Sequence, residues 1–97
     1  MKVRILASAS QDLIDGHHFY ESQAADLGDR FLDSLFKDIE SLASDAGIHP
    51  IYFGHYHRLL AHTFPFAIYY RVEDESVVIY AILDCRRDPT WTRQKLR

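Results

Sequence analysis

The stretch "FPFAIYYRVEDESVVIYAILDCRRDPTW", residues 64–91, contains two apolar runs joined by an acidic link, and it decides the fold. The first run, residues 66–72, alternates between two faces, with Phe66, Ile68, Tyr70 and Val72 on one and Ala67, Tyr69 and Arg71 on the other. A period of two residues predicts a half-buried strand. The second run, residues 77–84, is apolar on both faces until Asp84, which predicts an interior strand. Because the link at residues 73–76 is short, the two strands should be antiparallel.

A third strand is predicted just upstream, at residues 57–62, with a turn at Pro65. The three runs together predict an antiparallel meander, since short connections join neighbouring antiparallel strands. We expect one face of this sheet to stay partly open and to offer a surface to a partner. The side chains expected on that face are Tyr69, Arg71, Tyr80 and Ile82.

The N-terminal half predicts a strand followed by a helical hairpin. Residues 2–5 alternate apolar and basic side chains, as in a half-buried strand. A helix is predicted at about residues 10–25, with Ser8 or Ser10 as N-cap and an apolar stripe of Leu13, His17, Tyr20 and Ala24.

A second helix is predicted within residues 27–47, where apolar residues recur at spacings of three and four: Phe31, Leu32, Leu35, Phe36, Ile39, Leu42 and Ala43. We interpret this stripe as core, with Gly28 as the break between the helices and Gly47 as a left-handed C-cap. Residues 48–56 are expected to be an aromatic loop. The predicted fold is therefore α+β, in the order β-α-α-β-β-β, with the hairpin on a small antiparallel sheet and a short C-terminal tail.

Length and composition indicate one domain over residues 1–97 in a cytoplasmic protein. No apolar run approaches the roughly 20 residues needed to span a bilayer, so no membrane contact is expected. The single cysteine, Cys85, excludes an internal disulfide.

Charge is unevenly distributed along the chain. Residues 1–50 hold four Lys/Arg and nine Asp/Glu, whereas residues 85–97 hold five basic side chains against Asp88. A local positive end of this kind favours a contact with phosphates or with an acidic partner.

Enzymatic chemistry finds little support in the sequence. The six histidines show no spacing for a metal site, no serine lies in a nucleophile motif, and no glycine-rich phosphate loop exists, so we expect no metal and no cofactor. A proton-transfer ribonuclease needs only an acid or base with converging cations. His57 or His62 with Arg58, Arg71, Arg86 and Arg87 could supply these groups, and Tyr69 or Trp91 could stack bases.

The element order, together with residues 64–91, resembles the RelE/ParE superfamily of type II toxin–antitoxin toxins. "IYYRV", an acidic turn, an apolar strand and then "RRDP" followed by an aromatic residue are typical of its ParE-like members. The resemblance covers nearly the whole chain. It implies a small cytoplasmic toxin that forms a hetero-oligomer with a cognate antitoxin.

The resemblance leaves two activities open. RelE-like members cleave ribosome-bound mRNA with clustered basic residues, whereas ParE-like members inhibit DNA gyrase by protein contact. Arg87 matches the arginine after the final strand of the cleaving branch, but Ala67 stands where that branch has its middle-strand arginine. The resemblance therefore favours gyrase inhibition, with mRNA cleavage as the alternative.

The expected partner contacts lie at the end of the sheet and in the tail: Tyr69, Arg71, Arg86, Arg87, Trp91 and Arg93, with Lys95 and Arg97 beyond them. Aromatic and arginine side chains are the types favoured at binding hot spots. A structural alternative is that Arg86 or Arg87 pairs with Asp84 or the helix acids and ties down the sheet.

Overall fold

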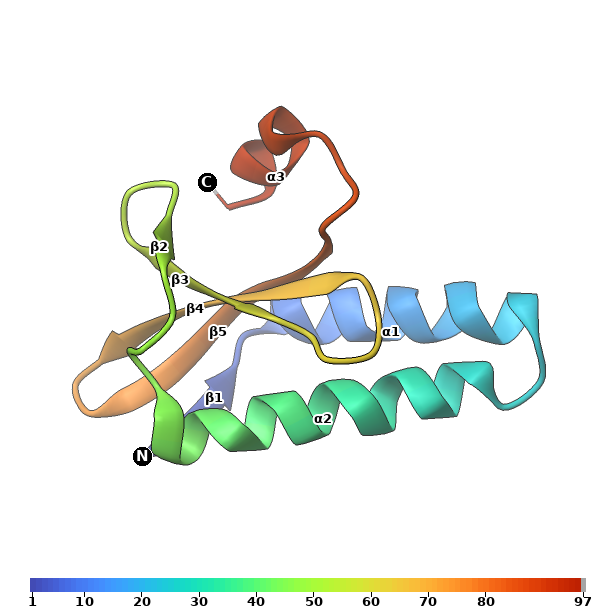
Figure 1. Cartoon of the computed structure of the whole chain (residues 1–97), viewed down its shortest axis with the longest axis horizontal. Helices are drawn as coiled ribbons and strands as arrows, with labels where there is room; N and C mark the ends of the chain where they lie inside the picture. Colours follow the sequence, from blue (N-terminus) through green and yellow to red (C-terminus); the bar gives the residue numbers. More distant parts are fainter. Residues whose placement is uncertain (97) are drawn as a thin grey trace.

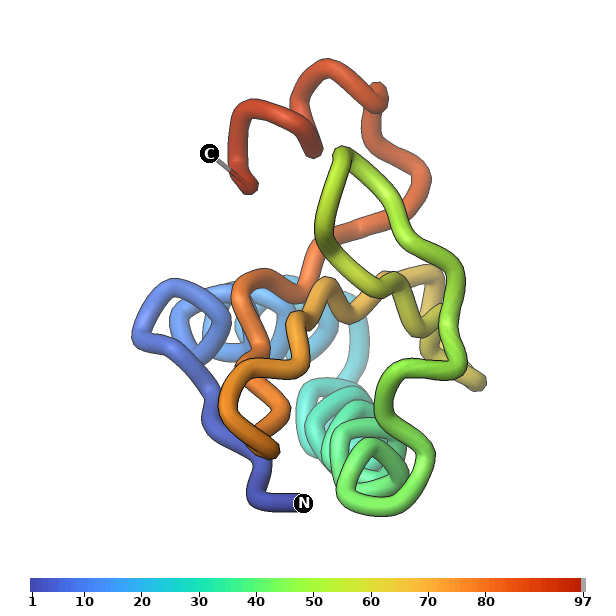
Figure 2. The backbone as a smooth tube through the Cα atoms, turned by 90° about the vertical axis from the view of Figure 1, so that its left-hand side faces the viewer, coloured from blue at the N-terminus to red at the C-terminus, as the bar shows by residue number. Residues whose placement is uncertain are grey.

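The computed structural model describes residues 1–96 as a mixed five-stranded sheet with two long helices on one face and a short helix on the other (Figures 1 and 2). In chain order the elements are β1 (Lys2–Ile5), α1 (Ala7–Gln23), α2 (Leu27–Asp45), β2 (Ile51–Tyr52), β3 (Tyr56–Leu60), β4 (Phe66–Glu73), β5 (Ser76–Asp84) and α3 (Pro89–Lys95). The predicted α+β class and the strand–helix–helix–strands order are confirmed. Among the described residues, no helix has the length and apolar character to cross a bilayer.

The sheet has the order β1-β5-β4-β3-β2. The meander of β3, β4 and β5 is antiparallel as predicted, and β5 has neighbours on both sides. β1 pairs with β5 in parallel, with Val3 opposite Val77 and Ile5 opposite Ile79, and this pair makes the sheet mixed. A parallel pair needs a long crossover, and here β1 and β5 are separated by the whole helical hairpin and meander.

A register shift between Tyr69 and Tyr70 changes which side chains of β5 face the helices. Tyr69 pairs with Ala81 but Tyr70 pairs with Ile79, so β5 carries one extra residue at Tyr80. The bulge reverses the alternation beyond it, as an extra residue must. Ile82 therefore packs into the helix-side core, and its prediction for the other face is wrong.

α1 begins at Ala7, earlier than predicted, with Leu6 at the N-cap position and no side-chain cap. The Ser8 hydroxyl donates to the Tyr80 carbonyl at 3.0 Å, and Asp12 accepts the Ile82 N–H at 2.9 Å. Both side chains thus bind the edge of β5 that the short β1 leaves uncovered. The N-cap role predicted for Ser8 or Ser10 is wrong.

The turn between the long helices lies at residues 24–26, not at Gly28. Asp26 adopts a left-handed φ of 67°, and the Glu21 carboxylate accepts the N–H groups of Asp26 and Gly28. Gly28 is buried inside α2, where a Cβ would lie 2.7 Å from the carbonyl oxygen of His17. Its role is close helix approach, and the prediction that it separates the helices is wrong.

The predicted stripe of α1 is right at Leu13 and Tyr20, which are buried with Ala9 and Gly16. Ala24 is exposed at the end of the helix, and His17 lies half-buried beside α2 with its Nε2 3.1 Å from Asp29 Oδ1. Leu13 and Tyr20 join the core that the helices share with the sheet, which includes Phe31, Leu35, Leu42, Ile68, Tyr70 and Ile79.

After α2, Gly47 takes the predicted left-handed conformation, with φ 92°, and donates its N–H to the Tyr70 hydroxyl at 3.0 Å. The expected loop at 48–56 contains a strand that the sequence analysis missed. β2 pairs with β3 through a turn in which Phe53 and Gly54 both have positive φ.

The C-terminal tail forms α3. Asp88 stays extended and accepts the Thr90 N–H at 2.6 Å, with Pro89 in the first turn, as the Asp-Pro pair favours. Leu96 is buried against the sheet, and its carbonyl accepts the Tyr56 hydroxyl at 2.7 Å. The helix and the β2–β3 hairpin rise on the same side of the sheet (Figure 2), so the second face is covered more than predicted.

Candidate functional site

The paired arginines after β5 have different environments. Arg86 forms a two-point ion pair with Asp84, with Nε 3.0 Å from Oδ1 and Nη2 2.6 Å from Oδ2. This bond holds the pKa of the Asp84 carboxyl below its usual range. The structural alternative is therefore confirmed for Arg86, which closes the end of the strand.

Arg87 instead lies over the indole of Trp91, with its guanidinium carbon 4.6 Å from the ring centroid. Lys95 lies 5.5 Å from the same ring, and Arg93 lies 5.5 Å from the ring of Phe53. Trp91 itself is half-buried, whereas Arg87, Arg93 and Lys95 are exposed. Arg87 and α3 thus bring three exposed cations together around aromatic rings. Arg97, predicted to extend this patch, lies outside the described residues.

On the same face of the sheet, Arg58 stacks over Tyr52 at 4.2 Å and Arg71 lies 3.6 Å from Glu73. The Tyr80 hydroxyl donates to Glu73, and this bond is the main cause of the raised pKa of Tyr80. Both arginines are half-exposed. Arg71 lies on the face that the alternating pattern predicted.

Tyr69 lies on the predicted face of the sheet, but it is covered there and not exposed. It is only 3% exposed, and its ring lies 6.0 Å from that of Phe53 beneath the β2–β3 hairpin. Burial also raises its pKa. The expectation that Tyr69 lies on an open surface is wrong, because the sequence pattern does not show that α3 and the hairpin cover this face.

The histidines that a ribonuclease would need lie on the other side of the sheet. The ring of His57 stacks on Tyr70 at 5.1 Å, and Tyr70 belongs to the helix-side core. His62 binds the α2 carboxylate of Asp38 through both its backbone N–H and its ring. The sheet separates both imidazoles from Arg58 and Arg71. Within residues 1–96, no three His, Cys, Asp or Glu side chains are grouped to hold a metal ion.

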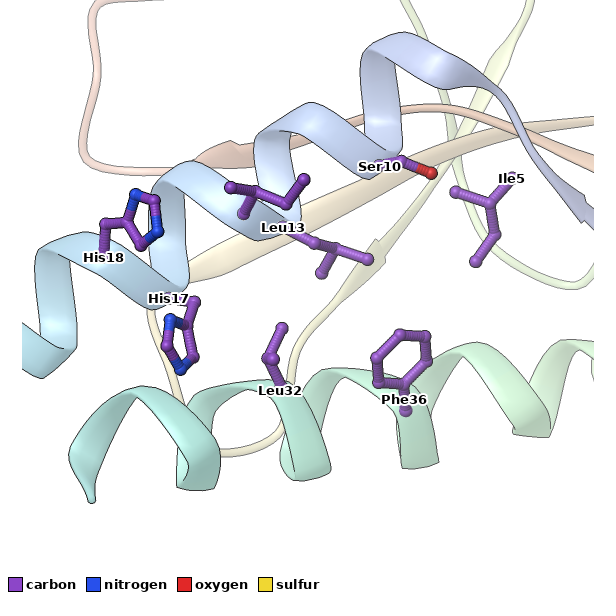
Figure 3. A pocket seen from close by; sticks show the side chains of 8 residues that line it. Ile5, Ser10, Leu13, His17, His18, Leu32 and Phe36 are labelled. Carbon is purple, nitrogen blue, oxygen red and sulfur yellow. The ribbon is translucent and has the colours of Figure 1, made fainter.

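A groove on the outer side of the helical hairpin is the feature that the sequence analysis missed. Its cavity is about 370 Å³ and lies between α1, α2 and the end of β1, with mostly apolar side chains (Figure 3). Phe36 and Ile14 on its walls are 41% and 47% exposed. Phe36 belongs to the stripe interpreted as core. The width of the apolar stripe was the sequence signal that could have indicated this groove, because Leu32 and Phe36 lie along one edge of the stripe.

The two helices that form this groove are acidic. α1 and α2, with the turn between them, hold nine Asp/Glu and two Lys/Arg, a net charge of −7. Asp29 pairs with His17 at one end of the groove. Such a groove is suited to an amphipathic segment with basic flanks.

Comparison with known proteins places the chain among bacterial toxins. A family model described as "ParE toxin of type II toxin-antitoxin system, parDE" matches residues 3–89. A chain from the solved structure "Chromosomal ParDE TA system from P. aeruginosa" is similar in fold, with a TM-score of 0.72 and 18% identity, over 84% of this chain and 92% of that one. None of the curated proteins compared with the chain matches it.

Proposed function

This chain belongs to the ParE toxin family of type II toxin–antitoxin systems, and on that premise we propose that it inhibits DNA gyrase by protein contact and is neutralised by a cognate antitoxin. Its site of action would then be the cytoplasm, where gyrase works. The contact surface would be the exposed cations and the tryptophan that follow β5: Arg87, Trp91 and Arg93, with Arg71 and Arg86 at its margin.

One observation carries the preference for contact over RNA cleavage: the candidate imidazoles lie on the opposite face of the sheet from the candidate arginines Arg58 and Arg71. General acid–base catalysis needs the proton-transfer group within hydrogen-bond reach of the reacting atoms, and cations within reach of the developing charge. His57 and His62 are held on the helix side by Tyr70 and Asp38. Arg86 is further occupied by Asp84. This geometry supports a binding role.

The groove between the long helices is the surface that best fits an antitoxin segment. The P. aeruginosa relative is part of a system named ParDE, which pairs a toxin with an antitoxin. A partner helix with apolar side chains at spacings of three and four would fill the groove, and basic flanks would meet the acidic helices. The free edge of β1 lies beside the groove and offers unpaired backbone groups to an extended continuation of that segment.

The test of the gyrase proposal uses purified protein in a supercoiling assay with relaxed plasmid. We expect inhibition by the wild type, and at least tenfold weaker inhibition by the double variant Arg87→Gln/Arg93→Gln. The matched control is Arg30→Gln/Lys37→Gln, which removes the same charge from α2. No inhibition by folded wild type, or equal loss in both variants, would contradict the proposal.

Two further experiments test whether the protein cleaves mRNA and whether the antitoxin binds the groove. Primer extension on mRNA after induction should show no new cleavage sites, and codon-spaced cuts would overturn the contact mechanism. Co-expression with the product of the neighbouring reading frame should restore growth. Ile14→Asp/Phe36→Asp, at two exposed groove positions, should stay toxic but escape that rescue. If these variants are rescued as well as the wild type, the antitoxin docks elsewhere.

A further inference from the structure

Charge is segregated between the two layers of the molecule. The residues of α1, α2 and the turn between them carry a net charge of −7, and all other residues carry nine Lys/Arg against five Asp/Glu, a net +4. A uniformly charged surface would not show this division. Figure 1 places the two long helices on one side of the sheet and α3 on the other, so the acidic helices and the basic C-terminal segment lie on opposite sides of the sheet.

The strand register lines up the cations of the sheet on the face away from the helices. Arg4 of β1 and Arg71 of β4 both pair with Val78 of β5, so the three form one row across the strands. Val77 and Ile79 on either side of Val78 point into the helix-side core. The row must therefore face the other way, because side chains alternate along a strand. Lys2 lies two residues before Arg4 on the same face.

The row continues through β3 into α3. Arg58 pairs in register with Tyr69, whose side chain lies on the second face, and Arg93 reaches the ring of Phe53 in the β2–β3 turn. We name as the cationic face the sheet residues Lys2, Arg4, Arg58 and Arg71 together with Arg87, Arg93 and Lys95 of the C-terminal segment. Among the ion pairs found in residues 1–96, only Arg71 of this set has a carboxylate partner.

Five cation–aromatic contacts occur in the described chain, and all five involve this face. Four of them are made by arginine. A guanidinium stacked on a ring keeps its N–H donors in the plane, where they can still form a two-point contact with an oxyanion. Alternating cations and aromatic rings are the arrangement that tracks a nucleic-acid strand, in which phosphates alternate with flat bases.

We propose that the cationic face binds the sugar–phosphate backbone of DNA directly. The predominance of stacked arginines favours phosphates and bases over an acidic protein surface, which would need no aromatic ring beside each cation. The protein would then contact the DNA bound to gyrase as well as gyrase itself. This proposal can be wrong even if the protein inhibits gyrase.

The net charge of −3 does not oppose this binding at moderate salt. The Debye length is about 10 Å at 0.1 M ionic strength. The long helices and α3 lie on opposite sides of the sheet along the vertical direction of Figure 1, which is the intermediate axis of the molecule and measures 29 Å. The α2 acids are therefore largely screened from DNA bound at the sheet, whereas Asp12 and Asp15 of α1 line a groove with Arg87 and Lys95 and weaken the positive potential there.

The test measures the fluorescence anisotropy of a labelled 20-nucleotide oligo-dT and of a labelled 20-base-pair duplex with the full chain. If the face neutralises four phosphates of the single strand, affinity should fall about 50-fold between 50 and 200 mM salt. Arg87→Gln/Arg93→Gln removes two of these contacts and should weaken binding roughly 10- to 30-fold at 0.1 M salt. Arg30→Gln/Lys37→Gln, with the same change in net charge, should leave binding within about twofold. The two probes show whether single strand or duplex is preferred.

Three outcomes would overturn the proposal. The first is no anisotropy change at 100 µM protein, a concentration of order 10⁻⁴ M that corresponds to the weak end of non-specific binding. The second is an equal loss of binding in the two double variants, and the third is competition by poly-glutamate as strong as that by DNA at equal charge. The last result would assign the face to an acidic protein. Circular dichroism of both variants checks that they are folded. The supercoiling assay on the same proteins keeps the two proposals separate, because inhibition without DNA binding rejects only this one.

Discussion

The hydrogen bond between Asp12 and the Ile82 N–H offers a sharp test of how α1 is attached to the sheet. β5 has a bulge at Tyr80, directly after Ile79, where its pairing with β1 ends. Further along β5, the Ile82 N–H donates a hydrogen bond to the Asp12 side chain at 2.9 Å. Asp12→Ala removes the acceptor and leaves a partly buried N–H without a partner. An unsatisfied group of this kind costs about 1–3 kcal/mol. For a domain of this size, a loss of about 1–3 kcal/mol lowers Tm by about 4–24 °C.

Asp12→Asn separates the hydrogen bond from the charge. Burial raises the pKa of Asp12, and this effect outweighs the opposing bond to Ile82 and the attraction of Lys95. Because the folded pKa lies above the ordinary 3.8, the contribution of this group to stability is full below pH 3.8 and is lost as pH rises through the folded value. An asparagine keeps an acceptor oxygen without that loss. We therefore expect Asp12→Asn to be at least as stable as the wild type at pH 7, and its advantage to shrink at pH 3.

The assay is thermal unfolding by circular dichroism at pH 3 and pH 7 for both variants and for the control Asp15→Ala. Asp15 lies one turn further along α1, is exposed, and among residues 1–96 accepts a hydrogen bond from the Gln11 side chain alone, so its loss should change stability by less than about 0.5 kcal/mol. The reasoning is refuted if Asp12→Ala is as stable as the wild type. It is also refuted if Asp12→Asn loses as much as Asp12→Ala, since the charge and not the acceptor would then hold the helix.

Three further outcomes are expected. Gly28→Ala should destabilise the fold by about 1–3 kcal/mol in urea unfolding, because its Cβ would lie 2.7 Å from the His17 carbonyl; an unchanged midpoint would show that the helices can separate freely. Tyr56→Phe removes the hydroxyl that binds the Leu96 carbonyl and should speed hydrogen exchange at residues 89–96 while β4 and β5 stay protected; uniform acceleration would contradict a local role for this bond. Burial, assisted by a neighbouring histidine, lowers the pKa of His49, so its contribution to stability is full above pH 6.5 and is lost as pH falls below that value; Tm should therefore drop more between pH 7.5 and 5 in the wild type than in His49→Gln, and equal drops would assign the pH dependence to other groups.

Much of the fold could be predicted because the pattern of apolar residues is a local property of the chain. Residues 66–72 and 77–84 alternate or stay apolar in the way that a half-buried and an interior strand require, and both strands are present. The helix within residues 27–47 followed from the spacing of its apolar side chains. The RelE/ParE resemblance was carried by the same C-terminal stretch and is confirmed by the family match.

The errors concern contacts between segments that are far apart in the sequence. Gly28 looked like a helix break because glycine is common in turns, but it is buried where α2 crosses the backbone of α1. Tyr69 looked exposed because nothing in the strand pattern shows that the β2–β3 turn and α3 cover it. Phe36 looked like core because the periodicity of a helix shows in which direction a side chain points. It does not show how far the neighbouring element extends over that side chain.

The candidate site divides in the same way. Arginines after the final strand and an aromatic residue in the tail were visible in the sequence, as was the excess of acid in the first half. The pairing of Arg86 with Asp84, the stacking of Arg87 on Trp91 and the separation of the histidines from the arginines were not. Each depends on where a side chain lies relative to groups on other elements.

The sequence by itself thus determined the kinds and order of the main elements, since backbone preference and side-chain period act over a few neighbouring residues. Only the tertiary structure decided which charges are free, which aromatic rings are covered and which apolar groove stays open. Those properties arise when strands pair and helices pack, and one extra residue in β5 is enough to move Ile82 from one face of the sheet to the other.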